Sequence, residues 1–288
     1  MRFEHLRGHG FPQELVGVWT ATHGDTLLPL QERAVVGTGL LRGGNVVVSA
    51  PTSSGKTLVA EMAAMHHVTA GRKAVFLVPT KALAEEQFSH LCRSLAPLRV
   101  RTVISTRERT RFDRDILDGR FDIAVMVYEK FKALLTIAPA MPARLGVVVV
   151  DELQILGERE RGAVADLLLA KLLSGAHRVQ VVALSAVLGP AARIGSWIGG
   201  DFLQWGERPV ELREGVLEAA SGLFTYREQN SGTEDAEQLL PPDSCAGSAE
   251  EFHAQAIRLL AAALVGRGEQ VLVFVPTRHL CRQWAWQF

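Results

Sequence analysis

A loop near the start of this 288-residue chain has residue types suited to holding a chain of phosphates. Its letters, APTSSGKT at positions 50–57, match the pattern G-x-x-x-x-G-K-[ST] except that alanine replaces the first glycine. In that pattern backbone N–H groups surround a phosphate, the lysine reaches the β- and γ-phosphates, and the last hydroxyl ligates Mg²⁺. We therefore predict a nucleoside triphosphate site with Mg²⁺, in which Thr57 is a metal ligand. The predicted contacts are Ala50, Pro51, Thr52, Ser53, Ser54, Gly55, Lys56 and Thr57.

A plainer interpretation of this loop is a serine-rich turn between a strand and a helix. Ser53 and Ser54 could cap the helix, because short hydroxyl side chains accept hydrogen bonds from the first free N–H groups. That interpretation does not explain why Gly-Lys-Thr stands in register at the start of the predicted helix. Nucleotide binding is therefore the favoured interpretation.

A pair of carboxylates, Asp151 and Glu152, follows a run of four valines at 147–150. Carboxylates at the C-terminal end of a buried parallel strand lie at the edge of the sheet where ligands bind. Asp151 would hold Mg²⁺ through water, and Glu152 would orient and deprotonate an attacking water, as phosphoryl transfer requires. Alone, such a pair is a common helix cap. Together with the loop it predicts catalysis by Lys56, Asp151 and Glu152.

These groups need a scaffold that brings strand ends together, and alternating apolar and amphipathic segments predict one. The predicted strands are 46–49, 74–78, 99–104, 122–127, 146–150 and 179–184, and the predicted helices are 56–69, 82–96, 109–117, 129–137 and 161–173. Strands that are apolar on both faces and separated by helices predict a parallel sheet covered on both sides. Residues 1–205 are therefore predicted to form a doubly wound α/β domain.

The composition changes after Trp205. The stretches RPVELREGVL and GLFTYRE alternate like antiparallel strands, and a segment rich in Gly, Pro, Ser and acids predicts a flexible loop over about 228–248. A helix at 249–265, a buried strand at 271–275 and a helical tail follow. Residues 206–288 therefore predict the beginning of a second α/β domain that is incomplete within this chain.

Composition excludes several classes of protein. Lys+Arg and Asp+Glu both number 31, so a uniformly basic nucleic-acid coat is excluded and any such binding must use local patches. Cys92, Cys245 and Cys281 form no C-x-x-C pair and no zinc spacing, which favours a reduced chain. The polar start and short apolar runs predict no signal peptide and no membrane partner. We expect a cytoplasmic protein, and the six lysines among 31 basic residues favour a bacterial or archaeal host.

Eight motifs, in order along the chain, resemble superfamily 2 helicases. They are LLPLQ, APTSSGKT, VPTKALAEEQ, STRER, VYEKFKALL, VDELQIL, LSAVLG and VLVFVPTRHLCRQ, and together they cover residues 25–288. The group they resemble most is the DExH-type one that holds archaeal repair helicases, the helicase part of polymerase theta and the RNA-exosome helicases. The resemblance implies RecA-like domains, ATP and Mg²⁺ as cofactors, and a monomer that moves on single-stranded or partly duplex nucleic acid. It favours DNA, with a role in repair or recombination.

The resemblance also implies roles for residues outside the loop. Adenine would be read by Gln31 beside Leu28, the nucleic-acid backbone would be contacted by Thr80, Lys81, Arg107 and Lys130, and hydrolysis would be coupled to strand movement by Gln154 and Ser185. Some of these residues have a plainer alternative: a helix-start residue for Gln31, and a solvated helix cap for Thr80 and Lys81. The stretch 99–114, with six arginines against two acids, could neutralise phosphates or simply form a solvated face.

Three departures from the family pattern bear on activity. Gln154 replaces the usual histidine, Val187 replaces the usual threonine, and the later motifs that supply arginines to the ATP site have no counterpart in this chain. We therefore expect ATP and Mg²⁺ to bind while hydrolysis by the chain alone is weak. The missing helicase half would come in cis, if the chain is a fragment of a longer helicase, or from a partner in trans.

Other interpretations of the chain remain open. It could be an RNA helicase of the exosome-associated type, or a clamp that grips nucleic acid without efficient turnover. Intact Lys56, Asp151 and Glu152 argue against such a clamp. A P-loop kinase or GTPase fits less well, because neither needs the PTKALAEEQ and LSAVLG segments.

Overall fold

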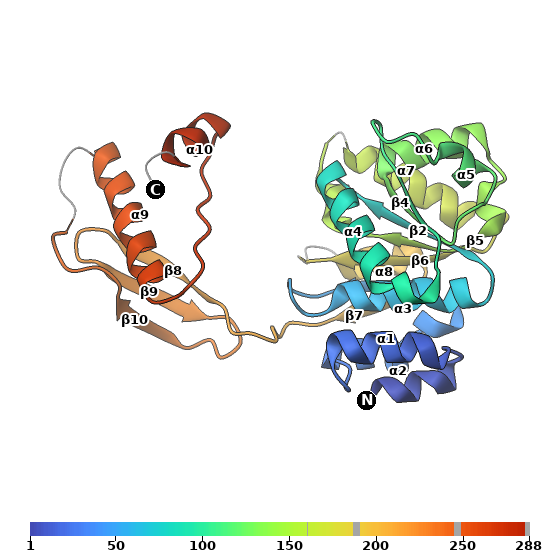
Figure 1. Cartoon of the computed structure of the whole chain (residues 1–288), viewed down its shortest axis with the longest axis horizontal. Helices are drawn as coiled ribbons and strands as arrows, with labels where there is room; N and C mark the ends of the chain where they lie inside the picture. Colours follow the sequence, from blue (N-terminus) through green and yellow to red (C-terminus); the bar gives the residue numbers. More distant parts are fainter. Residues whose placement is uncertain (160, 187–190, 245–248, 286–288) are drawn as a thin grey trace. The chain divides into compact units, whose positions relative to one another are not determined.

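A computed structural model describes residues 1–159, 161–186, 191–244 and 249–285 (Figure 1). The chain divides into two compact units, Met1–Pro209 and Val210–Phe288. Every candidate site residue predicted from the sequence belongs to the first unit.

The first unit is built on a seven-stranded sheet in the order β3-β4-β2-β5-β6-β1-β7. Its strands, all parallel, are β1 (Val46–Ser49), β2 (Lys73–Val78), β3 (Thr102–Ser105), β4 (Ile123–Val127), β5 (Leu145–Val150), β6 (Gln180–Ser185) and β7 (Asp201–Gln204). The inner strands are buried at nearly every position, as expected of apolar runs covered on both faces.

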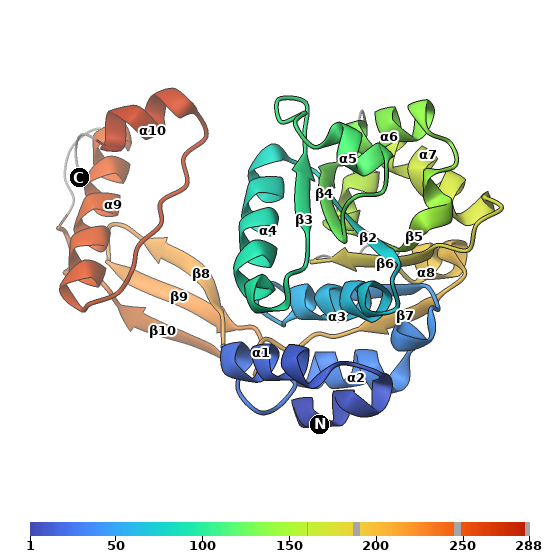
Figure 2. The same ribbon diagram turned by 45° about the vertical axis from the view of Figure 1, so that its right-hand side comes forward.

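Helices cover the two faces of this sheet. One face carries α1 (Gln13–His23), α2 (Pro29–Gly37), α3 (Lys56–Thr69) and α4 (Lys81–Ser94), and the other carries α5 (Asp113–Leu117), α6 (Tyr128–Ile137), α7 (Arg161–Ser174) and α8 (Ala191–Ile198). In β1, Val46 and Val48 pack on the first face and Val47 on the second. Figure 2 shows α3 and α6 on opposite sides of the sheet. The predicted doubly wound α/β domain is confirmed.

Short 3-10 helices complete the first unit, and some boundaries differ from the predicted ones. They are η1 (Phe3–His9), η2 (Leu40–Arg42), η3 (Ala96–Leu98), η4 (Met141–Arg144) and η5 (Leu153–Gly157). The strand predicted at 99–104 begins at Thr102, because η3 precedes it and Arg99 is left-handed (φ 54°). The helix predicted at 109–117 begins at Asp113, because the backbone forms a turn between Thr106 and Arg109. The sequence did not predict β7, which is short and has one buried residue.

In its described residues, the second unit contains an antiparallel sheet in the order β10-β9-β8 and two helices. Its elements are β8 (Arg213–Glu218), β9 (Leu223–Glu228), β10 (Glu234–Gln238), α9 (Ala249–Gly266) and α10 (Arg278–Ala285). The predicted antiparallel pair is confirmed as β8 and β9, with Arg213 opposite Glu228.

Two predictions for the second unit were wrong. The loop predicted over 228–248 contains β10, whose residues pair with Leu223–Arg227 of β9. Its acidic composition hid the strand, although Glu237 is balanced by ion pairs with Arg213 and Arg267. The run 271–275 belongs to no strand, because it has no neighbouring strand to satisfy its backbone within the described chain. Phe274 in that run is 86% exposed.

Two other expectations concern the chain as a whole. No helix in the described ranges is both long enough and apolar enough to cross a membrane. Cys92 and Cys281 are free thiols, and Cys245 lies outside the described residues.

A buried carboxylate ties the N-terminal helix to the helix that follows the phosphate loop. Glu61 of α3 is 1% exposed and accepts a hydrogen bond from Trp19 Nε1 of α1 at 2.6 Å. Its second oxygen lies 3.4 Å from Nε2 of His90 on α4. An isolated buried carboxylate is costly to desolvate, and these two contacts offset part of that cost. Three helices on one face of the sheet therefore meet at one charge.

The contact between His90 and Glu61 predicts a pH-dependent part of the folding stability. The pKa of His90 is raised, chiefly by its hydrogen bond to Glu61, while burial and Arg93 oppose the rise and Glu86 adds to it. A histidine pKa that is higher in the folded state contributes stability below the unfolded value of about 6.5 and loses it as the pH rises through the folded value. His90→Gln should therefore lower the melting temperature at about pH 6 more than at about pH 8.5.

Thermal unfolding followed by circular dichroism checks this expectation, because the difference between variant and wild type cancels contributions from other groups. His5→Gln, an exposed histidine at the chain start, is the matched control and should show no such difference. An equal loss at both pH values for His90→Gln would contradict the ionic nature of the contact.

Candidate nucleotide site

The phosphate-loop residues connect β1 to α3 through two left-handed residues. Ser53 (φ 66°) and Gly55 (φ 88°) lie in a region that residues with a Cβ rarely adopt. These turns allow α3 to begin directly at Lys56. A tight loop that opens onto the N-terminus of a 14-residue helix is an arrangement that binds phosphate through backbone N–H groups.

Lys56 is held inside the loop by backbone carbonyls. Its Nζ donates to the oxygen of Ala50 at 2.5 Å and to that of Pro51 at 2.6 Å. The buried hydroxyl of Ser54 donates to the same carbonyl of Pro51 at 2.6 Å. The loop therefore positions an ammonium group where an anionic ligand could take the place of weaker, neutral partners.

Asp151 and Glu152 follow β5 as the sequence predicts. The N–H of Asp151 donates to the carbonyl of Leu77 at 2.9 Å, and the buried hydroxyl of Tyr128 donates to the carbonyl of Asp151 at 2.7 Å. The carboxylate of Asp151 accepts the N–H of Glu152 at 2.9 Å. Glu152 is itself left-handed (φ 53°), so the chain turns sharply away from the strand here.

Burial and neighbouring charges change the ionisation of Lys56 and Asp151. Burial lowers the pKa of Lys56, while the charges of Glu152 and Asp151 oppose that change and Arg208 adds to it. Burial also raises the pKa of Asp151 to about 6, opposed by its bond from the Glu152 N–H and by Lys56, with the Glu152 charge adding to the rise. The charged form of each group is therefore disfavoured by burial and favoured by an opposite charge.

Gln154 and Ser185, the residues predicted to couple hydrolysis to movement, lie in one hydrogen-bonded chain with Glu152. Ser185 Oγ donates to Gln154 Oε1 at 3.0 Å, and Gln154 Nε2 donates to the carboxylate of Glu152. The amide thus bridges the end of β6 to the residue after Asp151. Val187, the second departure from the family pattern, lies outside the described residues.

Gln31 lies beside the phosphate loop, and Leu28 is its neighbour. The side chain is 4% exposed; Gln31 Oε1 accepts the N–H of Leu28 at 2.8 Å, and Nε2 donates to the carbonyl of Gly55 at 3.3 Å. The first of these bonds caps α2, which is the plainer role considered for this residue. The second joins α2 to the loop and places Gln31 beside the predicted phosphate contacts.

The predicted metal ligands suit Mg²⁺ held together with phosphate. In the part of the chain that the structure describes, the exposed Thr57 hydroxyl makes no hydrogen bond, and Asp151 is a half-buried carboxyl whose charge acts on Lys56. That same part contains no group of three or more His, Cys, Asp or Glu side chains able to form a metal cage. A hydroxyl and one carboxylate are the kind of sparse ligand set that Mg²⁺ accepts when phosphates and waters complete its shell.

Arg208 is a site residue that sequence reasoning missed. Its Nη1 donates to the hydroxyl of Thr52 at 3.2 Å, although the two residues are far apart in the chain. It reaches the loop because β7 runs parallel to β1, with Gln204 opposite Ser49. No sequence signal points to this role, because β7 was not predicted and Arg208 reaches the loop only through the pairing of β7 with β1.

The residues predicted to contact nucleic acid gather next to one another. Lys81, Arg107 and Lys130 line a cavity of about 510 Å³ beside the ends of β2 and β4. Thr80 caps α4 by accepting the N–H of Leu83 at 3.3 Å, which is its plainer role. Lys81 forms an ion pair with Glu108.

The arginine-rich stretch 99–114 is partly neutralised. Arg101 pairs with Asp115, Arg109 with Glu85 and Arg114 with Asp118. Arg107 is exposed and forms no ion pair with any described residue. For Arg101, Arg109 and Arg114 the solvated-face interpretation holds. Of the three cations that line the cavity, Lys81 is paired with Glu108 and Lys130 with Asp113, whereas Arg107 keeps its charge free of ion pairs with described residues.

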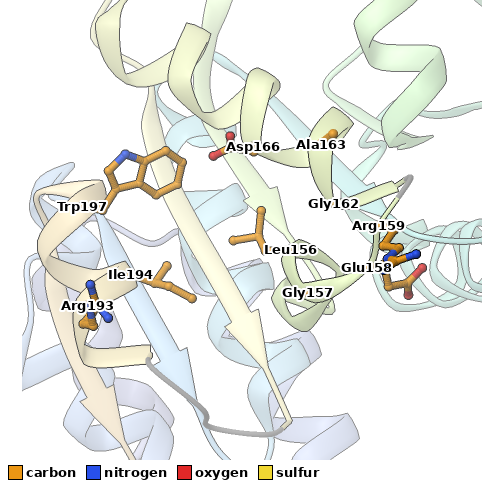
Figure 3. A pocket seen from close by; sticks show the side chains of 10 residues that line it. All are labelled: Leu156, Gly157, Glu158, Arg159, Gly162, Ala163, Asp166, Arg193, Ile194 and Trp197. Atoms are coloured by element: carbon orange, nitrogen blue, oxygen red, sulfur yellow. The ribbon is translucent and has the colours of Figure 1, made fainter.

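A larger cavity of about 690 Å³ lies between α7 and α8 (Figure 3). Trp197 and Ile194 of α8 line it from one side and Asp166 of α7 from the other. It contains no residue of the phosphate loop and neither Asp151 nor Glu152. Its size therefore does not mark it as the nucleotide site, which is defined by its chemistry.

A parallel α/β sheet with a phosphate loop after one strand and an Asp-Glu pair after another defines a nucleotide-binding domain of the P-loop class. Residues 29–193 match the DEAD/DEAH box helicase family, and the chain belongs to that family. The predicted resemblance to superfamily 2 helicases is confirmed.

Individual relatives agree with this assignment. The chain is 35% identical over 263 residues to the ATP-dependent DNA helicase Hel308 of Pyrobaculum calidifontis. That alignment covers 85% of this chain and 36% of the relative. The chain is 34% identical over 272 residues to the ATP-dependent DNA helicase Hel308 of Methanocella arvoryzae, covering 93% and 34%. The chain thus spans about a third of the length of these relatives.

A solved structure shows the same fold. A hypothetical ATP-dependent RNA helicase from Sulfolobus tokodaii aligns with a TM-score of 0.55, covering 68% of this chain and 57% of that one, at 18% identity. At this level of identity the likeness concerns the fold alone.

Substituting the loop glycine should disturb the site. A Cβ on Gly55 would lie 2.3 Å from Gln31 Nε2 and 2.9 Å from Leu28 Cδ1, at a φ of +88°. We expect Gly55→Ala to lower the free energy of unfolding by roughly 1–3 kcal/mol. Gly17→Ala within α1, where nothing lies within 4 Å, should instead stabilise the protein by about 0.5–1 kcal/mol. Urea denaturation of both variants checks this, and changes of the same sign would contradict it.

Proposed function

We propose that this chain is the nucleotide-binding part of an ATP-dependent helicase or translocase acting on single-stranded or partly duplex nucleic acid. The observation that carries the proposal is the electrostatic grouping of Lys56, Asp151 and Glu152 in a chain of the DEAD/DEAH box helicase family. DNA is favoured over RNA because the relatives named above are DNA helicases. A role in DNA repair or recombination is proposed on the same basis.

In this proposal Lys56 exchanges its carbonyl partners for the β- and γ-phosphates of ATP. Thr57 and Asp151 would hold Mg²⁺, which when bound neutralises charge on the phosphates. Glu152 would orient the attacking water and accept its proton. The hydrogen bond from the Gln154 amide supports that role, because it fixes the Glu152 carboxylate relative to the end of β6.

Fast hydrolysis in this proposal requires positive charge from a second domain. We propose that residues 206–288 begin that domain and that its remainder is supplied by a longer chain in cis or by a partner in trans. Arginines placed on a transferring phosphoryl group contribute roughly 10³–10⁵ in rate. The 288-residue chain alone, acting as a monomer, should therefore bind ATP with Mg²⁺ and hydrolyse it slowly.

The nucleic-acid backbone would cross the ends of β2 and β4. Lys81, Arg107 and Lys130 offer cations around one cavity there, and Thr80 starts a helix whose N-terminus faces the same edge. Contacts of this kind neutralise phosphates without reading bases, so binding would be independent of sequence.

Two substitutions separate nucleotide binding from turnover. Lys56→Ala should abolish detectable MgATP binding, because it removes the cation that faces the phosphates. Glu152→Gln should retain MgATP binding and lower the ATPase rate by at least about 10²-fold, because an amide cannot accept the proton. Binding is measured by calorimetry, and turnover by phosphate release with and without single-stranded DNA.

Glu158→Gln is the matched control, because Glu158 is an exposed glutamate six positions further along whose partner is Arg161. It should keep wild-type turnover. Full activity in Glu152→Gln would remove Glu152 from the base role. Nucleic-acid binding without any MgATP binding by the wild type would instead support the clamp.

Charge removal in the cationic cavity tests the nucleic-acid face. Arg107→Gln should weaken single-stranded DNA binding at low salt and reduce the slope of log K against log salt by about 1. Arg114→Gln is the control, because Arg114 belongs to the same stretch, is 90% exposed and pairs with Asp118 away from the cavity. Equal slopes for the two variants would place the nucleic acid elsewhere.

The same titration with single-stranded RNA of matching sequence distinguishes the two substrate classes. We expect tighter binding of DNA. A clear preference for RNA would favour an RNA helicase of the exosome-associated type.

A further inference from the structure

The residues that follow β7 leave the sheet beside the phosphate loop. Gln204 of β7 stands opposite Ser49 of β1, and the N–H of Trp205 donates to the carbonyl of Ser49 at 2.8 Å. Segments 50–52 and 205–208 therefore start from adjacent positions at the same edge of the sheet. A side chain three or four residues beyond β7 can reach the loop without any long excursion of the backbone.

Trp205 anchors this segment. Its ring lies 5.5 Å from the guanidinium of Arg33 on α2, a cation–π distance, and it packs partly buried against the core on that face of the sheet. The same helix carries Gln31, whose amide donates to Gly55. The loop and the segment after β7 are thus both held against α2, which restricts the positions available to Arg208.

Arg208 contacts the loop directly. Its Nη1 donates to Thr52 Oγ1 at 3.2 Å, and the segment that carries it leaves β7 beside the end of β1, where the loop begins. Thr52 and Lys56 are both predicted phosphate contacts. Two cations therefore approach the same loop, one from its helix side and one from the neighbouring strand β7.

The negative charge expected at the site favours a second cation beside Lys56. Asp151 and Glu152 act on Lys56 with negative charge, and a nucleoside triphosphate would add several more negative charges. Among the described residues, Lys56 and Arg208 are the cations whose side chains hydrogen-bond to this loop. A guanidinium offers a planar fork of donors that matches phosphate oxygens in pairs, and the hydrogen bond to Thr52 uses one of these donors.

We infer that Arg208 is a second phosphate-binding cation of the nucleotide site, supplied in cis by the segment after β7 and selective for triphosphate over monophosphate. The inference rests on the proposed function. Arg208 would turn from the hydroxyl of Thr52 to the phosphate chain when nucleotide enters. It differs from the arginines expected of a second domain, because it belongs to the same compact unit as the loop.

A purely structural role is the competing explanation. Arg208 could act as a strut that fixes Thr52 and the shape of the loop, with no contact to the ligand. A strut would affect every ligand that needs the loop and would lower thermal stability. If Arg208 contacts phosphate, its removal should weaken binding more for ligands with more phosphates. Arg208→Lys should then restore part of the lost affinity.

The experiment uses the whole 288-residue chain and displacement of a fluorescent ATP analogue by MgATP, MgADP and AMP. Arg208→Ala should raise the Kd of MgATP roughly tenfold, as expected for losing a charge-assisted hydrogen bond, and leave that of AMP unchanged. Arg208→Lys should recover part of the loss, because it keeps the charge without the fork. Arg42→Ala, an exposed arginine before the opposite end of β1, should behave as wild type.

Lys56→Ala, measured in the same assay, distinguishes failure of the Arg208 inference from failure of the proposed function. If Lys56→Ala loses MgATP binding while Arg208→Ala keeps wild-type affinity, the inference is overturned and the proposed function stands. Equal weakening for MgATP, MgADP and AMP, with a lower melting temperature, would assign Arg208 to the strut role and also overturn it. If Lys56→Ala binds MgATP like wild type, the proposed function itself fails.

Discussion

The parallel register of β1 with its two neighbours determines where the candidate site lies. β1 ends at Ser49, which stands opposite Ser185 of β6 and Gln204 of β7. The chain leaves all three strands at one level, so the phosphate loop emerges between the ends of β6 and β7. A slip of one residue would exchange the two buried faces of a strand such as Val46–Val48, and packing on both sides of the sheet forbids it. The hydrophobic core therefore sets the positions of the polar groups.

Burial of this edge prepares the site for a ligand that carries charges of both signs. The charged form of Lys56 is disfavoured by burial, and so is the charged form of Asp151. Each charge partly compensates the other, but neither is fully balanced within the protein. A metal–phosphate ligand brings positive charge toward the carboxylate and negative charge toward the ammonium, so binding relieves both penalties together. The partly buried charges of Lys56 and Asp151, which are unfavourable for folding, therefore favour binding of such a ligand.

The parts of this structure that could be predicted from the sequence have local signals. Valine-rich runs predicted the inner strands, and Gly-Lys-Thr at 55–57 predicted the helix start, because a left-handed glycine before a helix is a local requirement. The contacts of Arg208 with Thr52 and of Trp19 with Glu61 could not be predicted, since they depend on which elements become neighbours in space. The resemblance to helicases gave Gln154 and Ser185 a shared role, but not the hydrogen bond between them.

The second unit also shows that local sequence signals alone do not determine which segments form strands. The run 271–275 has strong local strand character and still belongs to no strand, whereas the acidic segment Glu234–Gln238 has weak character and forms β10. The difference is a partner: β9 presents its edge to β10, and no described strand does so for 271–275. β-propensity describes how well side chains fit a pleated surface, and pairing decides whether that surface exists.

The neighbours of β1 reach the nucleotide site through one polar side chain each. Ser185 at the end of β6 connects through the Gln154 amide to Glu152, while Arg208 beyond β7 contacts Thr52 of the loop. The first connection ends on the carboxylate that would handle the attacking water, and the second on the loop that would hold the phosphates. A ligand that changes the charge near Glu152 would affect its hydrogen bond from Gln154, which is itself bonded to Ser185 at the end of β6. A ligand that changes the charge near Thr52 would affect its hydrogen bond from Arg208, which follows β7. In a sheet with this strand order, β6 and β7 are therefore two physical connections through which a change in the loop after β1 can affect other parts of the first unit.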